Sequence, residues 1–344
     1  MMLDEAAIRA SLAGLNGPTG ALLLAADEVV SVVIEDRWAA VVLGKDQVSV
    51  EFLRLVHDHL WRSFPDATFE VRTGSDVFRG GSGFGQGRHV VAVLGGKGGV
   101  GKSTVAVSLA LTLSAMGLSV GLLDADLNGP DIPHMLGVHP RSGHRGLNWK
   151  LLTSTVTPPS QRPRPQERYR LEVMSVGFVV PERLPLAVTG RALVSTMLRY
   201  LIFGIAWSAD VLVIDAPPGT GEELQVMAHD LPLSGAIFVT TPQDLAQMDA
   251  ERTLGLLTEH GVPVIGLVQN MAGLTCPHCA QEIDLFSQST RLTDAGVRVL
   301  GRIPFDVRLS VTADQGEPLV LGDPRGPIAY EFAKIGLAVR RALE

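Results

Sequence analysis

The sequence predicts an α/β fold in which a doubly wound, mainly parallel sheet follows a small α+β domain. Short continuous apolar runs alternate with helical patterns along most of the 344 residues, as expected of parallel strands covered on both faces. A loop with five glycines connects the first of these runs to its helix. Aspartates directly follow two other runs, at the sheet edge where parallel α/β folds bind ligands.

Length and composition indicate a globular protein of two domains. Hydrophobic residues make up 46% of the chain and charged residues 19%, and the net charge is −7, which does not favour a nucleic-acid partner. No apolar run reaches the length of a transmembrane helix, and the N-terminus lacks the basic start and apolar block of a signal peptide. We therefore expect a cytoplasmic protein without a membrane partner.

Residues 1–72 predict the small α+β domain. Asp4 is expected to cap a short helix through Leu12, and apolar residues at helical spacing from Val50 to Phe64 predict a second helix. Strands are expected at residues 21–24, 29–34, 39–43 and 68–71. Residues 73–88 are rich in glycine and serine and predict a flexible linker, so that residues 89–344 form the second domain.

The second domain begins with a strand, a glycine loop and a helix. Val90–Leu94 is the apolar run, and a helical pattern opens at Lys102 and ends at Gly117. The loop fits G-x-x-x-x-G-K-[ST], the P-loop pattern, in the context that a P-loop NTPase requires. The residues expected at the nucleotide are Gly96, Lys97, Gly98, Gly99, Val100, Gly101, Lys102, Ser103 and Thr104.

The residue types in this loop suit phosphate binding. Backbone N–H groups must approach phosphate oxygens, and a Cβ atom would obstruct them. The N-terminus of the helix adds a partial positive charge. Lys102 is expected to reach the β- and γ-phosphates, and the Ser103 hydroxyl to bind Mg²⁺.

Two later strands end in carboxylates. The strand at 119–123 precedes Asp124 and Asp126, and the strand at 211–214 precedes Asp215. Asp215 suits a Walker B role, in which it holds Mg²⁺ through water. For Asp124 and Asp126, capping of a strand end is the alternative.

The remaining elements complete the sheet. Residues 139–170, rich in proline and arginine, predict a surface excursion. Apolar spacing at the C-terminal end predicts a helix docked on the core through Ile328, Phe332, Ile335 and Val339. Strands are expected within residues 171–178, 235–250, 262–268 and 299–305, and a long apolar helix at 192–205.

Cys276 and Cys279, the only two cysteines, form a C-x-x-C pair with metal-ligand spacing. A tetrahedral thiolate site or a [4Fe–4S] cluster takes four ligands, and one chain offers two. A two-fold dimer would bring two pairs together and complete four. A zinc site and thiol-oxidoreductase chemistry are the alternatives for the same motif.

Four motifs together resemble the Mrp/ApbC-type iron–sulfur cluster carriers of the SIMIBI class, to which MinD, ParA and the nitrogenase iron protein belong. They are KGGVGK, DADLNGPDIP, DAPPGTG and NMAGLTCPHC, and the resemblance covers about Val90 to Arg325. It implies that Lys97 crosses a homodimer interface to the partner's nucleotide, while Asp124 supports Mg²⁺ and Asp126 orients or activates the attacking water. The base pocket that it implies involves Asn270, Pro304 and Asp306.

The resemblance therefore implies an ATP- and Mg²⁺-binding homodimer that carries a [4Fe–4S] cluster, receives it from a cluster scaffold and transfers it to apo iron–sulfur proteins, with slow ATP hydrolysis. The position of residues 1–72 is similar to that of the N-terminal domain that often precedes Mrp-type ATPases. A positioning switch of MinD/ParA type, binding membrane or DNA, is the alternative function. An ATP-driven electron carrier like the nitrogenase iron protein would need widely spaced single cysteines, which this sequence lacks.

Overall fold

The computed structural model divides the chain into two compact units. The smaller holds residues 1–86, 148–164 and 199–206, and the larger holds the rest. The predicted bounds of the domains and linker stay a prediction, because residues 74–87 lie outside the described part of the chain. The described residues are 3–13, 15, 24, 28–44, 50–73, 88–126, 129–138, 164–179, 197–198, 200–219, 221–276, 278–279 and 281–344.

The smaller unit packs two helices on a three-stranded sheet. Its elements are α1 (Glu5–Ala13), β1 (Val29–Glu35), β2 (Trp38–Leu43), α2 (Val50–Ser63) and β3 (Thr68–Thr73). β2 pairs antiparallel with β1 and parallel with β3. The carboxylate of Asp4 accepts a hydrogen bond from the Ala7 N–H at 2.7 Å, which confirms the predicted cap. Of the predicted strand at 21–24, only Leu24 is described, and its side chain is buried in this core.

The larger unit is built on an eight-stranded sheet, which confirms the predicted doubly wound α/β class. Its strand order is β13-β10-β9-β4-β8-β5-β7-β6, and every neighbouring pair is parallel except β6 with β7. The strands are β4 (His89–Leu94), β5 (Val120–Asp124), β6 (Gln166–Arg168), β7 (Leu171–Ser175), β8 (Val211–Asp215), β9 (Gly235–Thr240), β10 (Val264–Asn270) and β13 (Val299–Ile303).

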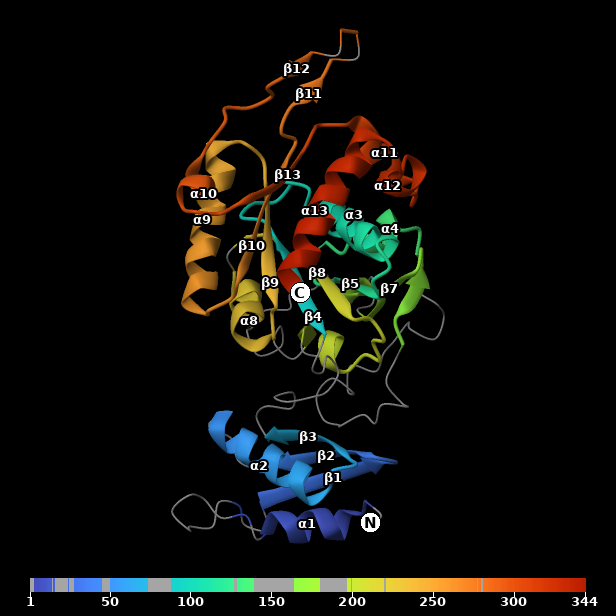
Figure 1. The fold of residues 1–344 in the computed structure, drawn as a ribbon, viewed down its shortest axis with the longest axis vertical. Helices are drawn as coiled ribbons and strands as arrows, with labels where there is room; N and C mark the ends of the chain where they lie inside the picture. The colour runs from blue at the N-terminus through green and yellow to red at the C-terminus, as the bar shows by residue number, and fades with distance from the viewer. Residues whose placement is uncertain are drawn as a thin grey trace. The chain divides into compact units, whose positions relative to one another are not determined.

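Helices cover both faces of this sheet (Figure 1). From β4 the chain crosses to β5 in one direction along the sheet. From β8 to β9, and from β9 to β10, it crosses in the opposite direction. Right-handed crossovers therefore place α3 on one face and α8 and α9 on the other. The larger helices of this unit are α3 (Lys102–Ala115), α8 (Glu222–Asp230), α9 (Asp244–Glu259), α11 (Val307–Asp314) and α13 (Pro327–Leu343).

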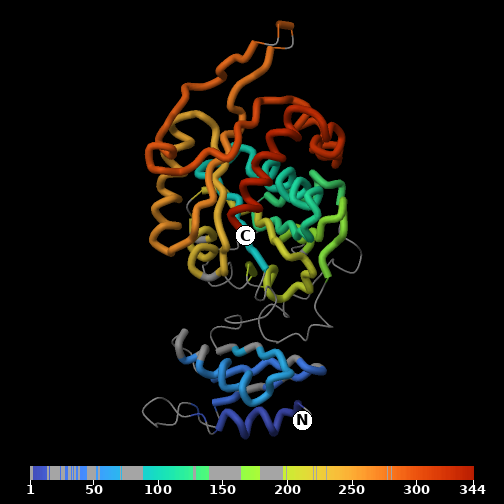
Figure 2. Tube along the Cα trace, viewed as in Figure 1, coloured from blue at the N-terminus to red at the C-terminus, as the bar shows by residue number. Residues whose placement is uncertain are grey.

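Shorter elements lie between the main strands and helices. They are α4 (Ile132–Met135), α6 (Val176–Val179), α10 (Arg291–Asp294), α12 (Leu319–Gly322) and the hairpin strands β11 (Leu274–Thr275) and β12 (Glu282–Ile283). The hairpin extends away from the end of the large sheet (Figure 2). No helix in the described part of the chain combines the length and apolar character needed to cross a bilayer.

Two local predictions need correction. The expected surface excursion at 139–170 instead contributes the edge strand β6, although residues 139–163 lie outside the described ones. The strand expected through Phe178 ends at Ser175 and passes into α6. A continuous apolar run cannot separate a buried strand from a short buried helix. Within the expected helix at 192–205, the described residues 197–198 and 200–203 are helical.

The C-terminal helix α13 docks on the core as predicted. Ile328, Phe332, Ile335 and Val339 are all buried, and the helix packs on α3 and β13. Gly301 on β13 lets the two elements approach closely, because a Cβ atom there would lie 2.7 Å from Ile335. Since α3 begins inside the P-loop, α13 supports the helix that presents the loop.

Ile335→Ala should therefore destabilise the larger unit by about 2–5 kcal/mol, because it leaves a cavity in a packed core. Leu337→Ala is the matched control: the side chain has the same number of atoms and lies on the same helix, but is 46% exposed. Chemical denaturation followed by far-UV circular dichroism measures both. A similar shift for the two variants would contradict the docking.

Candidate functional site

The P-loop lies between the end of β4 and the start of α3. Gly99 and Gly101 have positive φ angles of 78° and 85°, which side chains other than glycine rarely adopt. A Cβ atom on Gly96 would overlap the backbone of Ala250 in α9, and one on Gly101 would overlap the Asn270 side chain. The glycines are therefore required both by the turn and by close packing around it.

Backbone hydrogen bonds join the end of β4 and the start of the glycine loop to the segment that follows β8. The Ala216 N–H donates to the Val93 carbonyl at 3.1 Å, and the Gly219 N–H donates to the Gly95 carbonyl at 3.3 Å. Gly219 has a φ of 90°, which favours glycine at this turn. The turn after Asp215 thus lies directly against the phosphate loop.

Two carboxylates lie side by side behind the loop. Asp124 and Asp215 end β5 and β8 and are register partners across these strands. Both are buried, and so is Lys102, at 7% exposure. Burial raises the pKa of Asp215 to about 6, although the Lys102 charge and a hydrogen bond from the Ser103 side chain oppose this rise. Burial and the neighbouring Asp215 charge raise the pKa of Asp124 well above its usual range.

The Asp215 side chain is suited to a cation. Its Oδ1 atom is buried and finds no hydrogen-bond donor among the described residues. A buried acceptor without a partner is costly, and a hydrated Mg²⁺ would satisfy it. Mg²⁺ is commonly held by one or two carboxylates with waters and phosphates, so the pairing of Ser103 with Asp215 fits this ion. The described residues contain no cluster of three or more His, Cys, Asp or Glu side chains for a metal.

Asp124 has a different set of contacts from Asp215. Its carboxylate accepts hydrogen bonds from the Ser175 hydroxyl at 3.0 Å, from the Ile132 N–H at 3.2 Å and from the Asp126 N–H at 3.3 Å. It therefore ties β7 and the start of α4 to β5, which sequence reasoning did not foresee. Asp126 lies beyond the strand and is half-buried, and its carboxylate accepts a hydrogen bond from the Gly129 N–H at 3.2 Å.

A cavity of about 610 Å³ opens beside the P-loop and brings several predicted residues together. Its walls include residues predicted for the base pocket and others from α4 and α11 that the sequence did not indicate. The predicted members are Gly101, Thr104, Asn270, Pro304 and Asp306. The others include His134, Met135, Leu309, Ser310 and Ala313.

Two of these predicted residues also have structural contacts. The Asn270 side-chain amide donates to the Val100 carbonyl at 2.8 Å and so fixes the P-loop backbone. Asp306 accepts the Arg308 N–H at 2.9 Å, which caps α11, and pairs with the Arg308 guanidinium at 2.7 Å. The hydrogen bond from Arg308 lowers the pKa of Asp306. The positions of both residues match the predicted pocket, but their roles toward a base stay a prediction.

Lys97 is exposed in the loop, together with Gly98 and Gly99. Lys102 belongs to the same short motif, but its side chain is buried. An exposed lysine is available to a second chain, but its predicted role across a dimer stays a prediction.

The cysteines lie in the turn of the β11–β12 hairpin. The Cys276 N–H donates to the Gln281 carbonyl at 2.8 Å, which closes the turn. The backbone N–H groups of Cys279 and His278 and the Cys279 thiol form hydrogen bonds to the Cys276 sulfur and lower its pKa. Cys276 is half-buried and Cys279 exposed, and both are free thiols. Two neighbouring thiols, one of them favoured as thiolate, suit a soft metal ion or cluster.

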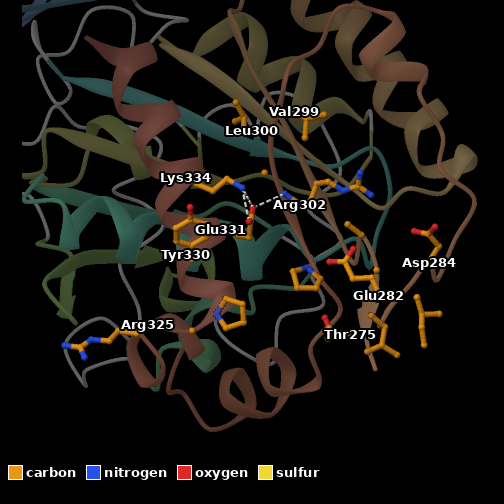
Figure 3. Close-up of a pocket in the computed structure, with 18 residues that line it drawn as sticks. Thr275, Glu282, Asp284, Val299, Leu300, Arg302, Arg325, Tyr330, Glu331 and Lys334 are labelled. Carbon is orange, nitrogen blue, oxygen red and sulfur yellow. Dashed lines mark hydrogen bonds and ion pairs between the residues drawn. The ribbon is translucent and has the colours of Figure 1, made fainter. Parts of the chain in front are cut away.

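A second cavity, of about 950 Å³, is larger than the cavity beside the P-loop. It lies at the base of this hairpin (Figure 3). Of the predicted site residues it contains only Pro304. Figure 3 shows the Glu331 carboxylate between Lys334 and Arg302. This carboxylate accepts hydrogen bonds from the Lys334 Nζ atom at 2.8 Å and from the Arg302 N–H at 3.5 Å. The smaller cavity is the one that adjoins the glycine loop and the start of α3, through Gly101 and Thr104.

Comparisons with known proteins identify the family to which the larger unit is similar. The family model described as NUBPL iron-transfer P-loop NTPase, of the ParA type, matches residues 86–340. An iron–sulfur cluster carrier protein of Pyrococcus abyssi is 40% identical over an alignment of 263 residues, and the alignment covers 72% of this chain and 84% of that protein. The iron–sulfur cluster transfer protein NUBPL of Mus musculus is 38% identical over an alignment of the same length, which covers 75% of this chain and 78% of that protein.

Solved structures show the same fold. A nucleotide-binding protein of Archaeoglobus fulgidus in complex with ADP is 32% identical with a TM-score of 0.55, covering 71% of this chain and 91% of that one. The septum site-determining protein MinD of Pyrococcus horikoshii, complexed with Mg-ADP, is 23% identical with a TM-score of 0.53, covering 73% of this chain and 96% of that one. The likeness to MinD concerns the fold alone. Because the family match and the carrier proteins span more than two thirds of its length, the chain belongs to the NUBPL-type iron-transfer family of P-loop NTPases.

Proposed function

We propose that this protein is an ATP-binding iron–sulfur cluster carrier that delivers a [4Fe–4S] cluster to apo-proteins. The observation that carries the proposal is the presence, in one compact unit, of a P-loop backed by buried carboxylates and an exposed hairpin with two free thiols. The relatives named as iron–sulfur cluster carrier or transfer proteins support the proposal that an iron–sulfur cluster is the cargo.

In the nucleotide site, Lys102 supplies positive charge beside the phosphates and the Ser103 hydroxyl and Asp215 hold Mg²⁺. The ion, when bound, neutralises charge on the β- and γ-phosphates. Asp124 supports this arrangement by fixing the ends of β5 and β7. Asp126 orients the attacking water, and Asn270, Pro304 and Asp306 line the adenine pocket. Hydrolysis is slow, because no arginine finger is evident in the sequence.

In the cluster site, Cys276 and Cys279 supply two thiolates per chain. A [4Fe–4S] cluster takes four cysteine ligands, so two chains of a homodimer share it. The lowered pKa of Cys276 favours the thiolate that binds iron. The cluster is cargo: it arrives from a scaffold and leaves to an apo-protein, and the exposed hairpin leaves it accessible to both.

Lys102→Ala should weaken ATP binding by at least about tenfold, because a charge-assisted contact to the phosphates is lost. Lys97→Ala is the matched control: it removes the same charge from the same loop, and we expect nucleotide affinity to be kept while ATP-dependent turnover falls. Isothermal titration calorimetry and a phosphate-release assay measure the two effects. Unchanged ATP affinity in Lys102→Ala would remove the P-loop assignment, and unchanged turnover in Lys97→Ala would remove the role across the dimer.

Asp215→Asn should stabilise the nucleotide-free protein at about pH 8 and abolish the added stability given by Mg-ATP. The pKa of Asp215 is raised to about 6 in the folded protein, from an ordinary value of about 3.9. The stability that protonated Asp215 contributes to the folded protein is therefore fully present below about pH 4, and it is lost as the pH rises through 6. The amide does not titrate, so the difference between variant and wild type should shrink toward about pH 4.5.

Melting temperatures across this pH range measure the Asp215 effect. Asp306→Asn is the control, because Arg308 lowers the pKa of Asp306 and its removal should destabilise the protein instead. An Asp215→Asn protein less stable than wild type at about pH 8 would contradict the account of this buried charge.

Anaerobic reconstitution should give about four iron atoms per dimer, as expected for Cys₄ ligation of one cluster. Cys276→Ala should lose the iron and the visible absorption while it keeps ATP binding. His278→Ala is the control in the same turn, since only the backbone of His278 contacts the Cys276 sulfur. A stable cluster on a monomer, or full iron content in Cys276→Ala, would contradict a cluster shared between chains.

A further inference from the structure

The base pocket has two walls that meet at a pair of glycines. His134 and Met135 of α4 form one wall, and α11 forms the other. Beyond the ends of these helices, Gly137 and Gly316 have positive φ angles of 60° and 72°. A Cβ atom on Gly316 would lie 2.7 Å from the Gly137 backbone, so the two turns are in direct contact.

A hairpin turn from the sheet edge holds these two ends together. The turn joins β6 to β7 and consists of Tyr169 and Arg170. The Arg168 Nε atom donates to the Leu136 carbonyl, at the end of α4, at 3.1 Å. The Tyr169 hydroxyl donates to the Gly316 carbonyl, after α11, at 3.0 Å.

The two side chains also contact each other. An Arg168 guanidinium nitrogen donates to the Tyr169 hydroxyl at 2.8 Å, and the guanidinium carbon lies 4.2 Å from the centre of the tyrosine ring. Together they form a continuous chain of contacts from α4 to the end of α11, which we name the Arg168–Tyr169 bridge. Its members lie outside the pocket and do not line it.

The backbone of this turn is in an uncommon conformation. Tyr169 and Arg170 have φ angles of 51° and 62°, and a bulky residue rarely adopts positive φ. Consecutive positive φ angles occur in type I′ hairpin turns, which usually contain glycine or asparagine. Hydrogen bonds of the Tyr169 side chain to Gly316 and Arg168 help to hold this conformation.

We propose that Arg168 and Tyr169 are positioning residues that fix the spacing of the two walls and thereby set the affinity of the pocket for the nucleotide base. The inference rests on the proposed nucleotide binding at the P-loop. The α4 wall is held at its first residue by the hydrogen bond from Ile132 to Asp124 and at its end by the Arg168–Tyr169 bridge. Loss of the bridge removes the side-chain hydrogen bonds that join this end of the wall to the end of α11, and it removes no contact of the phosphate loop.

The test compares a ligand that has a base with one that lacks it. Dissociation constants are measured in Mg²⁺ for ATP and for inorganic tripolyphosphate, with wild type and Tyr169→Phe. The variant keeps the ring and loses the hydroxyl that donates to Gly316. We expect ATP affinity to fall about fivefold, as for one net hydrogen bond, with tripolyphosphate affinity unchanged. Tyr330→Phe removes an equivalent hydroxyl from the exposed face of α13 and should leave both affinities unchanged.

Arg168 provides the second variant pair. Arg168→Met should weaken ATP binding at least as much as Tyr169→Phe, because it loses the donors to Leu136 and Tyr169, and Arg168→Lys should restore part of the loss. An equal fall for ATP and tripolyphosphate would mean that the bridge only maintains the fold, and no fall for either would also overturn the proposal. Wild-type protein that does not bind ATP would instead refute the proposed function, and the inference with it.

Discussion

The organisation of the larger unit depends on burying two carboxylates at adjacent strand ends beside one buried lysine. Asp124 and Asp215 each raise the free energy of the folded chain by being buried, and they repel each other. Lys102 offsets part of this cost for Asp215, and hydrogen bonds from the start of α4 and from β7 offset part of it for Asp124. A bound cation would balance the charge of these carboxylates, and bound phosphates would balance the charge of Lys102.

The proposed nucleotide and cluster sites are adjacent along the chain. Asn270 and Met271 line the base pocket, and β11 begins at Leu274, directly before Cys276. The Ala272 N–H donates to the Ile303 carbonyl at 2.9 Å, so this connection is held on β13. Under the proposed function, a change in the pocket would reach the thiols through these few residues, and this connection would be the physical route from ATP binding to the cargo.

Much of the fold and of the site was predictable because its residues stand in local patterns. The P-loop, the strand-end aspartates and the C-x-x-C each carry their chemistry within a few positions of the sequence. Contacts between distant segments were not predictable in this way. The hydrogen bond from Asn270 to Val100, the support of Asp124 by Ser175, and the contact of Gly137 with Gly316 join residues far apart in the chain. The edge strand β6 was missed because Gln166–Arg168 is short and contains no apolar residue.

The most direct test of the account is cluster delivery to an apo-enzyme whose activity requires a [4Fe–4S] cluster. Reconstituted wild-type protein is mixed with the apo-enzyme in the presence of a chelator that captures free iron, and the recovered activity is measured. The account predicts recovery with wild type and none with the Cys276→Ala, Cys279→Ala double variant taken through the same reconstitution. Equal recovery with the double variant, or none with a cluster-loaded wild type, would contradict it.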